Sequence, residues 1–246
     1  MATFVGMYDR IHVGHLDLSD ADEVSFGPIS AVAVPFPSFM AGGFVQFRPG
    51  LISGEFNVSA YQDFAADVLD DEIGVSGLGS QYPVSVAPNA TATDAAGDPA
   101  YFSRGLIGSY DPFGGAKGDA AKANIGMMYD TALIRGVLAV PKAARTASGN
   151  GTAIALAGPT ATQRLYAALH VFAYSGFTNV VVKVQSDDSG AMSSPTDRIT
   201  FATVTGTPAS EFASVAGSFA SETHHRAIWT VTGTGSITFA VYFGVL

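Results

Sequence analysis

Five histidines and several short acidic runs are the residues of this chain best suited to chemistry. His12 and His15 form an H-x-x-H pair, and Asp17 follows two residues later. On a helix this spacing would bring both imidazoles to one metal ion. The surrounding segment lacks a helical pattern and no third ligand is fixed, so the sequence predicts no metal site. We expect ordinary surface or interface histidines at these positions.

Two adjacent histidines and the single tryptophan form a second group of candidates. On a strand, His224 and His225 would point to opposite faces, so they could not easily share a ligand. We interpret them as the polar start of the strand that contains Trp229. Trp229 is flanked by Ile228 and Val231 and is expected in the core. As an exposed ring it would instead offer a stacking platform for a sugar.

The acidic runs are candidate sites for a hard cation such as calcium. Asp70, Asp71 and Glu72 are consecutive rather than alternating, so their side chains cannot all converge on one ion. We interpret them as a solvated helix end. The Asp-Asp-Ser run at 187–189 is a weaker candidate of the same kind.

Signatures of catalysis and of phosphate binding are missing from the sequence. There is no Gly-x-Ser-x-Gly motif around a serine nucleophile. The Gly-x-Gly pairs at 77–79 and 233–235 lack the third glycine and the following helix of a dinucleotide-binding loop, so we interpret them as turns. The sequence therefore predicts a protein that is not an enzyme, with no catalytic, cofactor-binding or metal-ligating residues and no cofactor.

The composition predicts a chain that is covered by other subunits. Of its 246 residues 48% are hydrophobic and only 13% are charged, whereas about a quarter is usual for charged residues. No apolar run approaches the roughly 18–20 residues that span a membrane, and the first residues do not resemble a secretory signal. The chain has no cysteine, which excludes disulfides and fits an intracellular origin or a particle assembled inside a cell.

The net charge of −9 is unevenly distributed. Through Asp130 there are 16 acidic and 5 basic residues, and from Thr131 onward 5 acidic and 7 basic. This asymmetry predicts either two surfaces that face each other in a stack or acidic residues that only solvate loops. The basic residues are scattered rather than clustered, which argues against tight binding of nucleic acid.

Short apolar runs between turn residues predict strands through most of the chain. They lie at 29–34, 44–47, 55–59, 83–88, 125–129, 132–140, 166–174, 179–185 and 198–204, with a further extended segment at 101–109. Pro49-Gly50 is a predicted turn between two of them. Ser175–Thr178 is a predicted hairpin loop, and the Gly-rich segment 111–119 a longer loop.

The last residues predict a β-hairpin. Ile237, Phe239, Val241 and Phe243 alternate with small or polar residues, as in a strand that is buried on one face. The segment 228–231 is its predicted partner, and the Thr-Gly-Thr-Gly run at 232–235 is the predicted turn.

One segment favours a helix. Ser59 can cap the run from 60 to 69, in which Tyr61, Phe64 and Val68 share one helical face. The predicted fold class is therefore mainly β, a β-sandwich or barrel with a short flanking helix and long loops. Two β-rich halves are predicted: residues 1–140, with the acidic helix near 60–70 and long assembly loops, and residues 151–246, with the small polar segment 141–151 as a linker.

The chain resembles the major tail (tail tube) proteins of long-tailed bacteriophages. The resemblance rests on Leu169–Gly244, with its ALHVFAYSGFTNVVVKVQ and ITFAVYFGV strands and HHRAIWTVTGTG turn. It also rests on FRPGLISGEFNVSAYQDFAADVLDD at 47–71. It is a likeness of pattern over about half the chain, and it brings no catalytic residues.

The resemblance implies a virion structural protein of the phage tail, assembled in the host cytoplasm. Such subunits self-assemble into stacked rings, usually hexameric, contact other tail proteins and let DNA pass through an acidic lumen without specific binding. The loop at 111–119 would be a contact between rings. Two alternatives remain: another phage structural role, in capsid decoration or the baseplate, and a carbohydrate-binding β-sandwich module.

Overall fold

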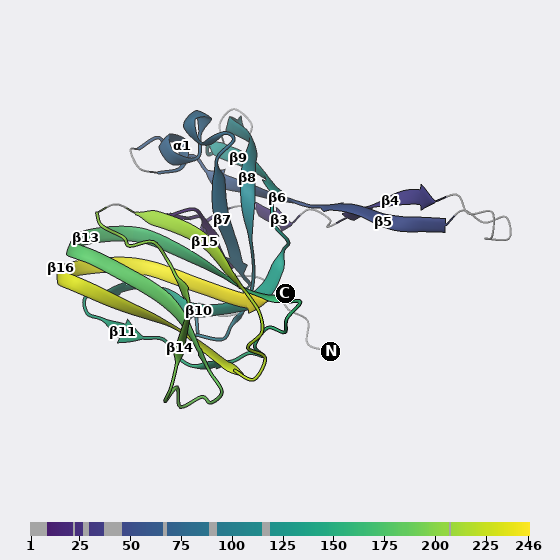
Figure 1. Cartoon of the computed structure of the whole chain (residues 1–246). Coiled ribbons are helices and arrows are strands. Elements are labelled where there is room, and N and C mark those ends of the chain that lie inside the picture. The colour runs from purple at the N-terminus through teal and green to yellow at the C-terminus, as the bar shows by residue number, and fades with distance from the viewer. Residues whose placement is uncertain are drawn as a thin grey trace. The chain divides into compact units, whose positions relative to one another are not determined.

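A computed structural model describes residues 9–21, 23–26, 30–36, 46–65, 68–88, 93–114, 119–206 and 208–246. The predicted fold class is confirmed, because these residues are mainly in β-strands, with one short α-helix among them (Figure 1). The chain forms two compact units. Unit 1 comprises residues 1–20, 81–104 and 131–246, and unit 2 comprises residues 21–80 and 105–130.

Unit 1 is built around one antiparallel sheet with the strand order β15-β13-β16-β10-β8-β7-β1-β2. Its members are β1 (Arg10–Val13), β2 (Leu16–Asp17), β7 (Gln81–Ala87), the first part of β8 (Pro99–Gly114), β10 (Ile134–Arg145), β13 (Arg164–Asp187), β15 (Ala209–Ala216) and β16 (His224–Val245). Three short strands pair with β13 or β16 beyond this order: β11 (Gly149–Asn150), β12 (Ile154–Ala155) and β14 (Thr196–Thr200).

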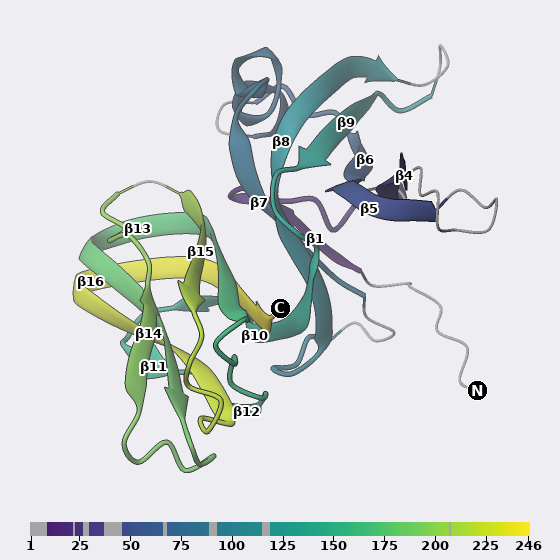
Figure 2. The ribbon, with the colours of Figure 1, turned by 45° about the vertical axis from the view of Figure 1, so that its right-hand side comes forward.

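Strands β13 and β16 lie side by side along almost their full length (Figure 2). β13 has 24 residues and β16 has 22. The predicted loop at Ser175–Thr178 and the predicted turn at 232–235 are both wrong, because these segments face each other as bulges inside two continuous strands. Gly176 and Gly233 adopt positive φ there, +79° and +91°. Glycine thus lets both strands bend where a turn was predicted.

The bend places the two ends of each strand in different layers. The segment of β16 before the bend pairs with β11 and β12, and the segment after it pairs with β10. Trp229 and Phe239, ten positions apart on β16, meet with ring centroids 5.4 Å apart. Together with apolar residues of β13 such as Val171 and Val182 they form a first core of sandwich type.

A second core lies on the opposite face of β13 and β16. It contains Phe102, Leu138, Ala168, Ala240 and Tyr242. The sequence interpretation of a half-buried last strand is therefore wrong, since every residue of β16 from 239 to 244 is buried. The sheet curls so that β1 and β7 approach β13 and β16. They cover the face of β16 that the alternation of apolar and polar residues predicts to be exposed to solvent.

The segment predicted to be a linker is part of the sheet. Pro141–Arg145 continues β10, and Ala143 and Arg145 pair with Phe239 and Ile237 of β16. Its small and polar residues suggest a linker in the sequence, but pairing with β16 keeps them in a strand. The two units therefore divide the chain differently from the predicted halves 1–140 and 151–246: β1, β7 and the start of β8 belong with the C-terminal strands.

Unit 2 contains a smaller antiparallel sheet with the order β3-β6-β9-β8. Its elements are β3 (Glu23–Phe26), β6 (Glu55–Tyr61), α1 (Leu69–Glu72), a 3-10 turn (Val75–Gly77), the second part of β8, and β9 (Lys122–Tyr129). Phe56, Val58, Ile107, Ile125 and Met127 are buried on one face of this sheet. β4 (Ser30–Phe36) and β5 (Gln46–Ser53) pair with each other and with no other described strand.

The short helix exists, but its predicted position near 60–70 is wrong. Ala60 and Tyr61 belong to β6, where they pair with Ala123 and Lys122 of β9. The Asp63 side chain then accepts a hydrogen bond from the amide of Ala65, a local turn contact that competes with a helix. The helix begins at Leu69, after Val68, and spans only four residues.

Two turn predictions in unit 2 are also corrected. Pro49 and Gly50 lie inside β5, at an irregularity in its pairing with β4, so this Pro-Gly pair does not reverse the chain. Asp111–Gly114, the start of the predicted Gly-rich loop, belongs to β8, and residues 115–118 lie outside the described residues.

Candidate functional site

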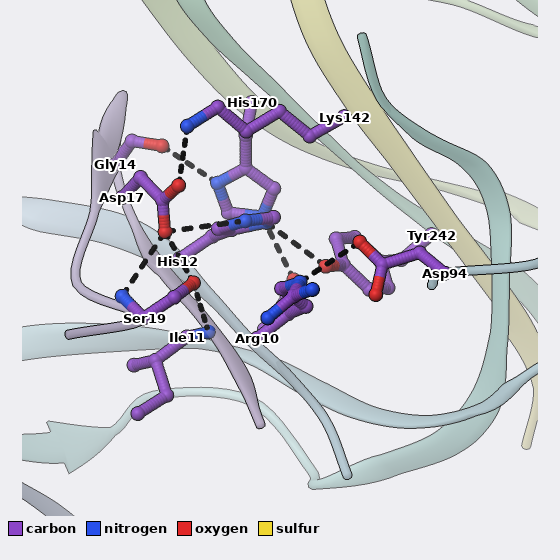
Figure 3. Close-up of polar contacts among 11 residues, drawn as sticks. Arg10, Ile11, His12, Gly14, Asp17, Ser19, Asp94, Lys142, His170 and Tyr242 are labelled. Atoms are coloured by element: carbon purple, nitrogen blue, oxygen red, sulfur yellow. Dashed lines mark hydrogen bonds and ion pairs between the residues drawn. The ribbon is translucent and has the colours of Figure 1, made fainter. Parts of the chain in front are cut away.

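Unit 1 contains a buried cluster of polar side chains around His12 on β1, His170 on β13 and Tyr242 on β16 (Figure 3). The ring centroids of His12 and His170 are 5.4 Å apart, and those of His12 and Tyr242 are 5.7 Å apart. The cluster sits where β1 approaches the second core. Its members are 158 and 230 positions apart in the sequence, so only the curl of the sheet brings them together.

His170 has a partner on each ring nitrogen. Its Nδ1 lies 2.6 Å from the carbonyl oxygen of Gly14, and its Nε2 lies 2.8 Å from Oγ of Ser85. A carbonyl oxygen only accepts hydrogen bonds, so Nδ1 carries the proton and donates. Nε2 is then the acceptor, and the Ser85 hydroxyl donates to it. This arrangement defines one tautomer and ties β7 and the β1–β2 turn to β13.

His12 is held less completely. Its Nδ1 lies 2.9 Å from the hydroxyl oxygen of Tyr242, with which it shares a hydrogen bond. Its Nε2 is buried without a hydrogen bond and lies 3.7 Å from a carboxylate oxygen of Asp17. Asp17 in turn accepts from Lys142 of β10 and from the Ser19 hydroxyl.

Burial sets the ionisation of this cluster. It lowers the pKa of His170 to about 4, although the Gly14 carbonyl acts in the opposite direction. Burial, followed by the neighbouring His170, lowers the pKa of His12 well below its ordinary value. Burial also raises the pKa of the Tyr242 hydroxyl well above its ordinary value. At neutral pH the interior of the cluster is therefore uncharged.

The Asp17 carboxylate marks the charged rim of the cluster. Burial alone would raise its pKa, but His12, Lys142 and Ser19 together bring it below its ordinary value. Close by, Nε of Arg10 donates to Asp94 at 2.9 Å. A shallow, open hollow in unit 1 is lined by this rim. Its cations are already paired with carboxylates, which leaves them poorly suited to binding an anion.

The Ser85–His170 pair has the spacing of a nucleophile and its general base. Both side chains are fully buried, however, so no substrate reaches the hydroxyl. The contacts instead fasten the β1–β2 hairpin to β13 and β16. The expectation of surface histidines is therefore wrong for His12, which is buried, while His15 is half-buried in the turn after β1.

His224 and His225 are the first residues of β16, as predicted, but His225 lies in an apolar environment rather than a polar one. His225 is buried, with its ring 6.0 Å from that of Phe243 and 6.4 Å from that of Phe219. Burial lowers its pKa to about 4. His224 is half-buried, and the two histidines differ in burial as adjacent residues of a strand do.

The prediction that Trp229 is a core residue is confirmed. Only 7% of its surface is exposed, and its Nε1 donates to the carbonyl oxygen of Ala147 at 2.9 Å. The Arg145 guanidinium lies over the ring at 5.2 Å. Trp229 therefore offers no free face on which a sugar could stack.

The acidic residues considered as cation ligands form hydrogen bonds within the protein instead. Oδ1 of Asp70 accepts from the Tyr110 hydroxyl at 2.7 Å and from Gln62 at 3.2 Å. The Asp187 carboxylate accepts hydrogen bonds from the backbone amides of Ser189 and Ser194, which stabilise the loop after β13. Among the described residues, no three His, Asp or Glu side chains are placed to hold a metal ion.

The two Gly-x-Gly pairs have different structures. Gly77 ends the 3-10 turn and Gly79 follows it with φ +83°, as predicted for a turn. Gly233 and Gly235 lie in β16 instead. Within the described ranges, no helix is long and apolar enough to cross a membrane.

Sequence reasoning missed Ser85, Lys142, His170 and Tyr242 as members of one cluster. Each lies on a different strand, and no local motif connects them. The one usable signal is that His170 interrupts an apolar segment of β13, where a buried ring requires a partner for each nitrogen.

No family model and no curated protein sequence matches the chain. Among solved structures, a chain in the sheath/tube terminator of PVC, an extracellular contractile injection system, is 16% identical. It aligns with 55% of this chain over 97% of its own length, with a TM-score of 0.44. A chain in the virion of a native gene transfer agent particle is 16% identical and aligns with 54% of this chain over 98% of its own length, with a TM-score of 0.39.

A third solved structure aligns with almost the whole chain. The Dit protein of phage SPP1, described as part of a hub adsorption apparatus, is 12% identical and aligns with 97% of this chain over 99% of its own length, with a TM-score of 0.34. At such low identities and TM-scores these likenesses establish neither a family nor a function.

Proposed function

We propose that this chain is a structural, non-enzymatic protein of a phage virion, and specifically a tail tube subunit. In this role it self-assembles into stacked rings, contacts other tail proteins and surrounds passing DNA without binding it specifically. The sequence resemblance over Leu169–Gly244 points to this role. The observation that carries the proposal is the build of unit 1, in which long strands are buried on both faces and the sheet ends in strands that pair on one side only.

With eight residues, β15 is longer than the two other strands of unit 1 that end this sheet, β2 and β14. It pairs with β13 on one side and with no other described strand. Its sequence, ASEFASVA, has one charged residue and no proline. Edge strands that stay unpaired in a monomer usually carry charges, prolines or bulges that block further pairing. A weakly protected edge supports pairing with a second subunit.

The charge pattern supports a conduit for DNA. Unit 2 contains eleven acidic and three basic residues, whereas unit 1 contains ten acidic and nine basic. A surface with few cations repels phosphates rather than holding them, so DNA could slide past it. The described cations near the histidine cluster are paired with carboxylates, which agrees with this role.

The absence of enzyme activity is supported by the burial of the Ser85–His170 pair. A nucleophile must reach its substrate, and both side chains of this pair lie inside unit 1. Incubation of the full chain with ester, glycoside and phosphoester reporters should give no turnover above that of a Ser85→Ala control. Turnover that the Ser85→Ala substitution abolishes would contradict this part of the proposal.

The assembly proposal is tested by electron microscopy of the purified full chain over a range of concentrations, together with its copy number in virions. We expect rings or tubes and many copies per particle. A low copy number would favour the baseplate, and copies distributed over the capsid would favour decoration. A strictly monomeric protein that is absent from virions would overturn the structural role altogether.

The contribution of β15 is tested with a charge at its exposed end. Ala216→Lys adds a cation to this edge, and Thr200→Lys adds the same charge to an exposed position of β14 as the matched control. We expect Ala216→Lys to weaken assembly more than Thr200→Lys does. Equal assembly of both variants would remove β15 from the interface.

A further inference from the structure

The outward face of the unit 2 sheet carries two rows of short polar side chains. In the first row Asn57, Gly126 and Ser109 lie in register on β6, β9 and β8. In the second row Ser59, Asn124 and Asp111 do the same. Each residue of the second row lies two positions from one of the first row along its strand, so both rows project from the same face.

These rows line a shallow hollow. With Ser25 of β3 and the intervening backbone they line an open hollow of about 360 Å³, within the size range of small-molecule sites. Gly126 forms part of its floor. A Cβ atom at this position would lie 2.4 Å from Oγ of Ser109 and 3.3 Å from Oδ1 of Asn57. The glycine therefore leaves room for these two side chains to converge above the sheet.

Three exposed aromatic side chains follow the second row along the chain, beyond the residues that line the hollow, and we call them the aromatic group. Tyr61 follows Ser59 by two residues on β6, and Phe113 follows Asp111 by two residues on β8. Tyr61 is 51% exposed, Phe64 is 60% exposed and Phe113 is 75% exposed, and the rings of Phe64 and Phe113 have centroids 6.3 Å apart. Large apolar side chains are seldom left this exposed in a group unless the surface has a partner.

The chemistry of the hollow excludes several classes of ligand. Its lining contains one carboxylate, Asp111, which is too few for a metal site. The excess of acidic residues in unit 2 disfavours phosphates and nucleic acid. The polar rows offer no deep apolar pocket of the kind that anchors a protein partner.

A neutral, hydroxyl-rich ligand fits what remains. Each asparagine amide offers both a donor and an acceptor, serine hydroxyls offer either, and Asp111 accepts, which matches the paired hydroxyls of a pyranose ring. The aromatic group can pack against the apolar C–H face of an adjoining sugar unit. We propose that this face of unit 2 binds a neutral oligosaccharide, with the polar rows holding one sugar and the aromatic group the next.

The site is unrelated to Trp229, the residue that the sequence marks as the candidate sugar platform. It also does not depend on the proposed role in a virion, because it belongs to unit 2 and uses none of the strand edges of unit 1. Failure of assembly and failure of sugar binding are therefore separate results.

The test is binding of the full chain to an immobilised panel of neutral oligosaccharides, namely glucose, galactose, mannose and N-acetylglucosamine oligomers, beside sulfated and sialylated ones. We expect at least one neutral series to bind, and binding to weaken by about tenfold or more in Asn57→Ala, Asn124→Ala and Phe113→Ala. The anionic oligosaccharides should not bind better than their neutral counterparts.

Two controls separate loss of the site from loss of the fold. Asn150→Ala makes the same change at an exposed position of unit 1 and should leave binding unchanged. In the folded wild-type chain, the methyl resonance of Met128, which is 53% exposed one row beyond Asn57, should shift on titration with the bound oligosaccharide. The methyl of Met192 in unit 1 should not shift.

Three outcomes overturn the proposal. The first is that no neutral oligosaccharide binds at about 1 mM, the weak end of specific recognition. The second is that binding survives in folded Asn57→Ala, Asn124→Ala and Phe113→Ala chains. The third is that the Met192 methyl responds while the Met128 methyl does not.

Discussion

The two units of this chain use β-sheets in opposite ways. In unit 1 the central strands are buried on both faces, and side chains from six strands meet in the histidine cluster. In unit 2 the sheet is buried on one face, and the other face carries exposed polar and aromatic side chains. All five histidines lie in unit 1, whereas unit 2 carries most of the net negative charge. Because unit 1 buries its strands on both faces and unit 2 leaves one face exposed, the same type of substitution should change the stability of the two units by different amounts.

The largest difference is expected from removing a phenyl ring in each unit. Phe239 is fully buried against Trp229, so Phe239→Ala should lower the free energy of unfolding by about 3–5 kcal/mol. Phe113 is 75% exposed, and Phe113→Ala should change it by less than about 0.5 kcal/mol. Urea denaturation of both variants measures this difference. Similar losses would show that the contrast in burial does not describe the chain in solution.

Mild acid should act on unit 1 before unit 2. The pKa of His170 in the folded chain is about 4, below the ordinary value of 6.5 expected when the chain is unfolded. The unfolded state therefore takes up the proton first, and stability falls as the pH drops from about 6.5 toward 4. Between pH 7 and pH 5 His170 alone should cost on the order of 2 kcal/mol. His12, which faces His170, Asp17, Lys142 and Arg10, acts in the same direction.

Hydrogen exchange at the two pH values locates this effect. Protection of β1 and β13 should decrease at pH 5, while β6 and β9 of unit 2 should keep theirs. His170→Gln retains a donor and an acceptor and should reduce the pH dependence of unit 1. Equal loss of protection in both units would contradict the assignment of acid sensitivity to the buried histidines.

Removing one hydroxyl should also distinguish the units, with a smaller effect. Tyr242→Phe deletes the hydrogen bond to His12 and leaves both nitrogens of a buried ring without a hydrogen bond, at a cost of about 1–3 kcal/mol. Tyr110→Phe in unit 2 deletes the hydrogen bonds of this hydroxyl to Asp70 and Gln62, but these two side chains still bond to each other. Its cost should be lower, and thermal unfolding of both variants measures the order. A larger loss for Tyr110→Phe would reverse it.

The sequence predicts the strands of both units better than it predicts their continuity. Ser175–Thr178 and the Thr-Gly-Thr-Gly run have the residues of turns, but glycine at positive φ serves a bulge as well as a turn. Which of the two forms depends on the strand opposite, and that information is not local. The histidine cluster is hidden for the same reason, since the partners of His12 lie on strands that are remote in sequence.

The smallest effect is expected at glycines with positive φ. Gly176 lies at the bend of β13, where an added Cβ would be 2.8 Å from the carbonyl oxygen of Thr234. Gly79 of unit 2 has φ +83° and no atom within 4 Å of such a Cβ. Gly79→Ala should cost about 1 kcal/mol for the backbone conformation alone, and Gly176→Ala about 1 kcal/mol more. Urea denaturation that finds the two variants equal would show that the bend tolerates a side chain.

The opposed bends of β13 and β16 have a consequence for how the two strands recognise each other. A two-stranded ribbon of this length could slide by two residues and still place apolar side chains on the same faces. Here a slide would move the bulge of one strand away from the bulge of the other, and the ribbon could no longer fold over Trp229 and Phe239. The bends therefore fix the register of β13 against β16, because they favour one pairing among several that would bury the same apolar side chains.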